Sequence, residues 1–371
     1  MKKVLFLENI PSPYRVDFFT VLGTMCDLTV LFETKSATYR NDEWMKLEHP
    51  TFRSVFMKQK RLGKMQICTE VCKYLSNDYD AIIVGVYNMP TSILAMQYMR
   101  MRKISFYISI DGGMIKSESK LKKVEKTYLL SGANAWMSPS SESDRYLVYY
   151  GANPKKIFRY NFTSLLSKDI MSADEMIKSK DKFREELGIQ ERYMVLSVGR
   201  FNLNKGYGKG YDVLMKVAEK ATKEIGFYFV GDEPTEEFVD WKREKGLENV
   251  HFISFLPKSE VSKYYASSDL FVLLTRGDVW GLVINEAMSY SLPIITTDKC
   301  VAGLELVEKG KNGYIVGAGE VDPVYNYMME VIGDKRKREM MGLVSRRIID
   351  TYSIEIMAEQ HMRIFENGCT H

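Results

Sequence analysis

Cysteine and histidine are scarce in this sequence. Its five cysteines are Cys26, Cys68, Cys72, Cys300 and Cys369. They form no CxxC pair and are odd in number, so their spacing indicates neither a zinc site nor a disulfide framework. The four histidines, His49, His251, His361 and His371, stand singly, which disfavours a zinc centre and a Ser/His catalytic arrangement. We therefore predict no metal site, and cysteines that are reduced and mostly buried.

Long apolar runs are also lacking. No stretch reaches the roughly 18 successive uncharged apolar residues that a membrane-spanning helix needs. The amino-terminal segment MKKVLFLENIPSPY has only a short apolar run that ends in an acid, whereas a signal peptide needs a longer one. We interpret this run as a first strand. We expect a cytoplasmic protein whose membrane contact, if any, is peripheral and on the inner face of the cell membrane.

Charge is distributed unevenly along the chain. Residues 1–165 contain 24 Lys+Arg and 15 Asp+Glu, whereas residues 166–371 contain 28 and 33. A basic first half favours an anionic partner, such as a phosphorylated lipid, a membrane surface, a nucleic acid or an acidic glycan. A solvated cationic face without a partner is the alternative. We find no nucleic-acid recognition motif and expect no nucleic-acid partner.

Short apolar runs alternate with helical patterns throughout the 371 residues, a length that favours two domains. In the first half, residues 3–7, 27–33, 81–87 and 104–110 are strand-like, and residues 16–25, 65–76 and 91–101 have helical spacing. A polar stretch at 166–185 precedes a second series of strand-like runs at 193–199, 226–232, 250–255, 270–274, 293–297 and 313–317. This rhythm predicts an α/β protein with two doubly wound, parallel-sheet domains joined near residue 165.

The stretch TRGDVWGLVINEAMSYSLPII, residues 275–295, holds two acids that flank a glycine. It predicts a loop at the carboxyl end of a strand, followed by a helix that starts near Gly281. The first amides of such a helix suit a phosphate. Asp278 and Glu286 could accept hydrogen bonds from a hydroxylated ligand on either side of it. Alternatively, Glu286 is a surface acid of the helix and Asp278 is its cap.

A second candidate site is the stretch VLSVGRFNLNKGYGKGYDVLMKVAE, residues 195–219. Arg200 follows a strand, and the glycine-rich loop after it carries Lys205 and Lys209. A guanidinium, an ammonium and loop amides could converge there on one diphosphate. The loop matches neither the GxGxxG fingerprint nor a Walker A motif. Otherwise it is a flexible basic turn.

Several motifs together resemble glycosyltransferase family 4, the retaining sugar-nucleotide enzymes with the GT-B fold. They are VGRF, KGYDVL, FVGDEP, FISFLP, SSDLFVLLT, DVWGLVINEAM, PIITTD and GKNGYIV, in the family's order and spacing. In the first half, IPSPYRVDFF, IDGG and YGANPKKIFRYNFTS are similar to a bacterial subgroup that builds surface polysaccharides. The resemblance implies two Rossmann-like domains that face each other across a cleft. It divides the chain into an acceptor-binding domain (1–165), a donor domain (166–347) and a tail helix (348–371) that crosses back.

The resemblance assigns roles to the paired acids. Glu286 would bind the ribose of the donor and Asp278 the hydroxyls of the transferred sugar, although most members have Glu at the latter position. Arg200 and a lysine would bind the diphosphate. Lys209 matches the family pattern better than Lys205, and both stay open.

The resemblance extends to the surroundings of the donor and the acceptor. Amides of Trp280, Gly281, Leu282 and Val283 would face the diphosphate and the sugar, and Phe255 or Leu256 would lie beside the base. Asp111 stands where many members have a histidine near the reacting carbon, and could contact the sugar or the acceptor. It could equally be a turn residue at the end of a strand.

The activity implied is transfer of a sugar from a UDP- or GDP-linked donor to a saccharide acceptor. The resemblance implies a lipid-linked acceptor destined for a capsule or O-antigen, and no metal or other cofactor. The segments FRSVFMKQKRLGKM, YMRMRK and KSESKLKKVEK mix cations with apolar residues, as a surface that touches an anionic membrane would. The alternatives are a nucleotide-sugar epimerase or hydrolase of the same fold, and a non-catalytic nucleotide-sugar binding protein.

Overall fold

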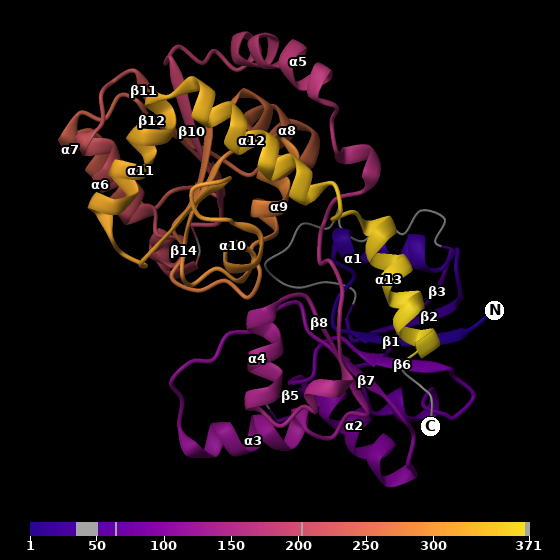
Figure 1. Cartoon of the computed structure of the whole chain (residues 1–371). Helices are drawn as coiled ribbons and strands as arrows, with labels where there is room; N and C mark the ends of the chain where they lie inside the picture. Colours follow the sequence, from indigo (N-terminus) through magenta and orange to yellow (C-terminus); the bar gives the residue numbers. More distant parts are fainter. Residues whose placement is uncertain (35–50, 64, 202, 368–371) are drawn as a thin grey trace. The chain divides into compact units, whose positions relative to one another are not determined.

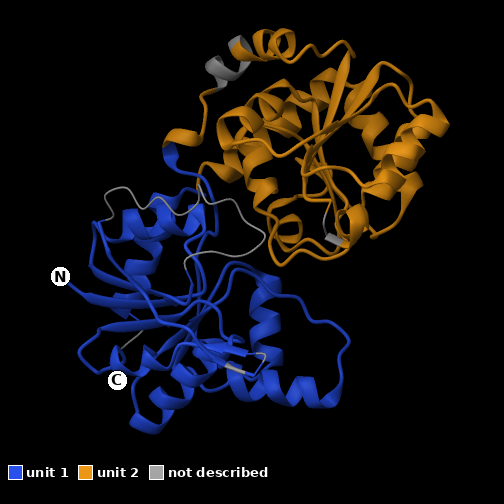
Figure 2. Cartoon of the chain, turned by 180° about the vertical axis from the view of Figure 1, so that it is seen from behind, with its two compact units in different colours: residues 1–167, 352–371 blue, residues 168–351 orange. Residues whose placement is uncertain are grey.

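The computed structural model describes residues 1–34, 51–63, 65–201 and 203–367. The chain divides into two compact units, unit 1 (residues 1–167 and 352–371) and unit 2 (residues 168–351), which Figure 2 distinguishes by colour. Cys369, His49 and His371 lie outside the described residues. Within the described ranges, no helix is both long enough and apolar enough to traverse a bilayer.

Unit 1 is built on a parallel sheet with the strand order β3-β2-β1-β6-β7-β8-β9 (Figure 1). Its strands are β1 (Lys3–Glu8), β2 (Asp27–Phe32), β3 (Arg53–Phe56), β6 (Ala81–Val84), β7 (Tyr107–Ser109), β8 (Ala135–Ser138) and β9 (Ile157–Arg159). Its helices are α1 (Pro13–Leu22), α2 (Pro90–Arg102), α3 (Lys120–Leu130), α4 (Ser141–Tyr149) and α13 (Ile354–Asn367). β6, β7 and β8 are buried along their whole length, as expected of parallel strands covered on both faces.

The tail helix α13 packs on α1 within unit 1. The ring of His361 is fully buried, with its centroid 4.7 Å from the ring of Phe18 and 4.7 Å from that of Tyr160. Burial lowers the pKa of His361 to about 3, so the ring is neutral at physiological pH. The amide of Ile354 donates to the carbonyl of Leu165 at 2.8 Å. Residues from both ends of the chain therefore share one core.

The helix predicted over residues 65–76 is wrong. Residues Met65–Ile67 form β5, which pairs with β4 (Lys60–Leu62), and the 3-10 helix η2 (Thr69–Lys73) follows. Cys68 between them is extended, because its amide donates to Thr91 Oγ1 at 3.1 Å and its thiol faces the carbonyl of Glu33. These contacts with distant residues override the local helical spacing.

Unit 2 is built on a second parallel sheet, with the strand order β12-β11-β10-β13-β14-β15. Its strands are β10 (Tyr193–Gly199), β11 (Ile225–Gly231), β12 (Val250–Ile253), β13 (Leu270–Leu273), β14 (Ile294–Thr297) and β15 (Gly313–Val316). Its helices are α5 (Ala173–Glu186), α6 (Tyr211–Lys220), α7 (Glu236–Lys245), α8 (Lys258–Ser267), α9 (Leu282–Ser289), α10 (Val301–Leu306), α11 (Val321–Gly333) and α12 (Lys335–Ile349). The 3-10 segment η5 (Leu203–Lys209) links β10 to α6.

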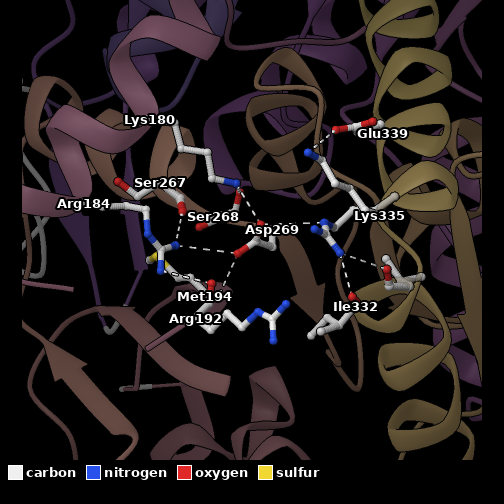
Figure 3. A network of polar contacts seen from close by, with 12 residues as sticks. Lys180, Arg184, Arg192, Met194, Ser267, Ser268, Asp269, Ile332, Lys335 and Glu339 are labelled. Atoms are coloured by element: carbon white, nitrogen blue, oxygen red, sulfur yellow. Dashed lines mark hydrogen bonds and ion pairs between the residues drawn. The ribbon is translucent and has the colours of Figure 1, made fainter. Parts of the chain in front are cut away.

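A buried acid, Asp269, connects helices α5 and α12 to the amino end of β13 (Figure 3). Its carboxylate accepts from the amide of Met194 at 2.9 Å and from Lys180 Nζ at 2.8 Å. Arg184 and Arg338 each approach it at 3.7 Å. The network joins α5, β10 and α12 at the end of the sheet opposite to the loop that carries Asp278, so we interpret it as structural.

Candidate functional site

The carboxyl ends of β10 and β13 mark the place where the strand order of unit 2 reverses. From β10 the chain continues outward through β11 and β12, and it then returns to β13 on the other side of β10. In open parallel sheets, ligands bind outside the carboxyl ends of the strands at such a switch point. The two stretches singled out in the sequence, residues 195–219 and 275–295, both pass through this place.

The loops that follow β10 and β13 are held together. The amide of Arg276 donates to the carbonyl of Gly208 at 3.0 Å. The guanidinium of Arg276 donates two hydrogen bonds, of 2.6 and 2.7 Å, to the carboxylate of Asp212. Gly210 has a φ of 72°, and a Cβ at this position would collide with the carbonyl oxygen of Leu274. Only glycine lets the backbone at position 210 come this close to Leu274, so the loop that carries Lys209 packs against the loop that carries Asp278.

The structure brings Lys209 and Asp278 into direct contact. Lys209 Nζ lies 2.6 Å from Asp278 Oδ2, and the two side chains are only 12% and 18% exposed. The other carboxylate oxygen accepts from the amide of Trp280 at 3.4 Å, and the amide of Asp278 donates to the carbonyl of Lys299 at 2.9 Å. An oriented cation and an oriented carboxylate therefore stand side by side at the switch point.

Gly281 shapes the start of α9. It has a φ of 106°, and a Cβ there would lie 2.7 Å from the thiol of Cys300. The amides of Leu282 and Val283 belong to the first turn, where a helix offers no internal acceptors. The indole of Trp280 is buried and donates to Asn285 Oδ1 at 2.9 Å, so its side chain is part of the core. Trp280 can therefore present only its backbone to a ligand.

Glu286 lies in the second turn of α9, and a tyrosine orients it. Glu286 Oε2 accepts from the hydroxyl of Tyr265 at 3.0 Å. Tyr265 is buried and stacks on Tyr290, with 5.5 Å between centroids and an interplanar angle of 9°. Burial and the neighbouring carboxylate raise the pKa of Tyr265, so its hydroxyl stays protonated and donates. Glu286 is half-buried and held in a fixed position.

The remaining predicted residues of unit 2 are more exposed. Arg200 follows β10 and is exposed, and Lys205 is exposed with left-handed backbone angles of φ 52° and ψ 40°. Within the described ranges, neither side chain forms an ion pair. Phe255, 55% exposed, and the half-buried Leu256 follow β12, on the same edge of the sheet. The environments of the two lysines thus differ: Lys209 forms an ion pair with Asp278, whereas Lys205 is exposed at a residue with left-handed backbone angles.

Asp111 belongs to unit 1, at the carboxyl end of β7. It forms an ion pair with Arg15 and accepts from the hydroxyl of Tyr14 at 3.2 Å. Arg15 is 3% exposed, and its Nε lies 3.6 Å from Oε1 of the buried Glu8. Burial raises the pKa of Glu8 to about 7 against the opposing effect of Arg15. The partly exposed carboxylate of Asp111 is therefore paired with the buried guanidinium of Arg15, which also lies close to Glu8.

Arg15 and Glu8 were not predicted from the sequence, although the sequence carries a signal for Arg15. The buried positions of α1 are Arg15, Phe18, Phe19 and Leu22, which recur at three- and four-residue intervals. A cation on the apolar stripe of a helix predicts a buried ion pair, because an unpaired charge there would be very unfavourable.

No cluster of three or more His, Cys, Asp or Glu side chains suited to a metal is found in the described part of the chain. The DYD tripeptide at residues 78–80, which resembles a metal-binding DxD motif, directly precedes β6. Its last acid, Asp80, accepts from the amide of Lys3 at 2.7 Å.

Comparisons with known proteins agree with the motifs. Residues 179–347 match the family described as "Glycosyl transferases group 1". The chain is 28% identical to "Sulfoquinovosyl transferase SQD2" of Arabidopsis thaliana over 232 residues, which are 61% of this chain and 43% of the relative. It is 30% identical to an "Uncharacterized 41.2 kDa protein in cps region" of Klebsiella pneumoniae over 171 residues, 46% of this chain and 43% of the relative. These alignments span less than half the length of each relative.

A solved structure shares the whole fold. The structure of HepE from Anabaena, in complex with UDP, superposes with a TM-score of 0.81 and 18% identity, covering 98% of this chain and 99% of the other. The predicted α/β GT-B fold is thereby confirmed. The chain thus has the GT-B fold, and its residues 179–347 match the group 1 glycosyl transferases.

Proposed function

We propose that this chain transfers a sugar from a nucleoside-diphosphate donor to a lipid-linked saccharide in the synthesis of a bacterial surface polysaccharide. Unit 2 binds the donor and unit 1 binds the acceptor. Two comparisons support the proposal, since the structure of HepE contains UDP and the Klebsiella relative is named for the cps region. The observation that carries it is the contact between Lys209 and Asp278 beside the glycine-started helix α9.

The donor diphosphate binds to Lys209, Arg200 and the first amides of α9. A diphosphate carries more negative charge than one carboxylate, so it competes with Asp278 for the ammonium of Lys209. The lysine is already oriented and little exposed, so little side-chain entropy is lost when the donor arrives. Asp278 then becomes available to accept hydrogen bonds from the hydroxyls of the sugar.

The same groups stabilise the leaving group. When the anomeric bond breaks, negative charge develops on the nucleoside diphosphate while the sugar becomes oxocarbenium-like. Preorganised cations and amides that face this charge contribute about 3 kcal/mol each to lowering the barrier. Two side-chain cations and a helix terminus offset the charge without a metal ion. The acceptor hydroxyl attacks the face that the diphosphate leaves and passes its proton to the departing phosphate oxygen, which retains the anomeric configuration.

The other residues of unit 2 set the orientation of the donor. Glu286, held by Tyr265, accepts from the ribose hydroxyls. Phe255 or Leu256 lies beside the base, where an exposed aromatic ring gains apolar contact on binding. Asp278 is one methylene shorter than Glu, so the sugar hydroxyls that it selects lie closer to the loop after β13.

Unit 1 supplies the acceptor side. Asp111 accepts a hydrogen bond from an acceptor hydroxyl, and its ion pair with Arg15 orients the carboxylate. The protein works in the cytoplasm and contacts the inner face of the membrane peripherally, where a lipid-linked acceptor would be presented.

A thermal-shift screen of UDP-, GDP-, ADP- and CMP-sugars tests the proposal. A donor at about 100 times its dissociation constant stabilises the protein by about 2.7 kcal/mol, which raises the melting temperature by several degrees. We expect one nucleotide class to do so, and Glu286→Ala to weaken its binding about tenfold or more through loss of charged hydrogen bonds. An unchanged dissociation constant in Glu286→Ala would remove the ribose assignment, and no shift with any nucleotide would contradict the donor site.

A further inference from the structure

Helix α3 of unit 1 exposes an apolar stripe. Leu121 is 84% exposed, Val124 66% and Tyr128 57%. Their spacing of three and four residues places them on one face of the helix. Leu129 and Leu130 are buried, so α3 has its own contacts with the core at its carboxyl end. A stripe of this kind has an unfavourable hydration free energy and indicates a contact surface.

The stripe belongs to a firmly anchored helix. Arg100 of α2 donates to the carbonyls of Tyr128 and Leu129 at 2.8 Å each. Lys126 lies 2.6 Å from Glu118, which precedes the helix. The hydroxyl of Tyr128 donates to Gln97 of α2 at 2.7 Å, so this ring stands in a fixed position despite its exposure. The outward face of α3 is therefore preformed.

Cations outnumber acids on α3 and just before it. Lys116, Lys120 and Lys122 are exposed, and so is Lys123, whose Nζ lies 3.9 Å from the centre of the Tyr149 ring. Glu125 is the one exposed acid of α3. The end of the adjacent helix α2 adds the exposed Met101, Arg102 and Lys103. The surface thus combines exposed apolar side chains with a clear excess of positive charge. The charge and the apolar side chains of this surface are complementary to a partner with an anionic outer layer and an apolar layer directly beneath it.

We propose that the outward face of α3 docks unit 1 on an anionic lipid bilayer. Leu121, Val124 and Tyr128 enter the boundary between headgroups and acyl chains, and the lysines contact the phosphates. The phosphates of a nucleic acid could also contact the lysines, but a nucleic acid has no apolar layer in which Leu121 could be buried. The inference rests on the proposed function in one respect, because a membrane-docked unit 1 needs an acceptor that is held in the membrane.

Helix α12 of unit 2 provides a matched control. It is also basic and exposes two apolar residues, Met340 at 55% and Leu343 at 57%. Several of its cations are engaged, since Lys337, Arg338 and Arg346 contact Glu330, Asp269 and Asp350. Helix α12 thus also exposes an apolar pair, Met340 and Leu343, but several of its positive charges are already paired and cannot contact lipid headgroups.

Vesicle flotation with the full chain tests the proposal. The probes are vesicles of phosphatidylcholine alone and of phosphatidylcholine mixed with phosphatidylglycerol. We expect the protein to float with the mixed vesicles. The double variant Leu121→Ser/Val124→Ser should bind about tenfold more weakly because apolar burial is lost. Replacing Lys120, Lys122 and Lys123 with Gln should weaken binding about fivefold per charge.

The control Met340→Ser/Leu343→Ser should float as the wild type does. Wild-type-like binding by Leu121→Ser/Val124→Ser, or equal losses in the α3 and α12 variants, would overturn the proposal. No flotation of the wild type with mixed vesicles would also overturn it, and would point instead to a protein partner for this face. Nucleotide binding, measured on the same samples, separates the two hypotheses, because a protein that binds nucleotide but no vesicles refutes the docking surface alone.

Discussion

Glu8→Gln should change how the stability of unit 1 depends on pH. Glu8 is 3% exposed at the carboxyl end of β1, with Arg15 3.6 Å away as its cationic neighbour. A Cβ added to Gly85 would collide with its carboxylate, so the site is closed on that side. Burial therefore outweighs the attraction of Arg15 and favours the protonated acid.

The size of the effect follows from the pKa. Burial raises the pKa of Glu8 from 4.5 to about 7, which at about 1.4 kcal/mol per pKa unit corresponds to about 3 kcal/mol. The folded state holds the proton more tightly than the unfolded state. The stabilising contribution is thus fully present below pH 4.5 and is lost as the pH rises through about 7.

The assay is urea unfolding of the wild type and of Glu8→Gln from about pH 5 to about pH 8, followed by tryptophan fluorescence, to which the buried Trp136 of unit 1 contributes. The stability of Glu8→Gln relative to the wild type should increase by about 2.5 kcal/mol over this range. Glu125→Gln, at an exposed acid of the same unit, should show no such trend. A constant difference between Glu8→Gln and the wild type at every pH would refute the reasoning.

Three further predictions concern other residues. The wild type should lose up to about 5 kcal/mol of its free energy of unfolding as the pH falls from 6.5 towards 3, because the buried ring of His361 resists protonation. His361→Gln should abolish this loss, which urea unfolding at a series of acidic pH values measures. Lys209→Ala should weaken nucleoside-diphosphate binding about tenfold or more and lower kcat about 100-fold, whereas Lys205→Ala should stay within about twofold. Calorimetry and turnover measure both lysines, and equal effects would contradict the choice of Lys209. Gly281→Ala should destabilise unit 2 by about 2 kcal/mol, because φ is 106° and the new methyl group meets Cys300; a melting temperature equal to that of the wild type would argue against this strain.

The parallel strands of unit 2 could be predicted from sequence because their apolar runs are short, separate and bounded by turn residues. Residues 193–199, for example, coincide with β10. The segment 65–76 could not be predicted in the same way. There the apolar spacing fits a helix, and only the tertiary contacts of Cys68 with Thr91 and Glu33 decide otherwise.

The candidate site was predictable in its parts but not in its pairings. The sequence shows two lysines in one glycine-rich loop and cannot say which one reaches the second loop. The structure distinguishes them, since Lys209 touches Asp278 across 69 positions of sequence. Arg15 and Asp111 are 96 positions apart, and local patterns carry no information on such a pair. Whether these residues bind donor and acceptor stays a prediction.

A crystal structure with a bound nucleoside diphosphate tests the central claim most directly. Our account predicts the diphosphate against Arg200, Lys209 and the amides of Leu282 and Val283, with the ribose hydroxyls on Glu286. A nucleotide bound away from the carboxyl ends of β10 and β13, or one that leaves Lys209 on Asp278, would contradict it.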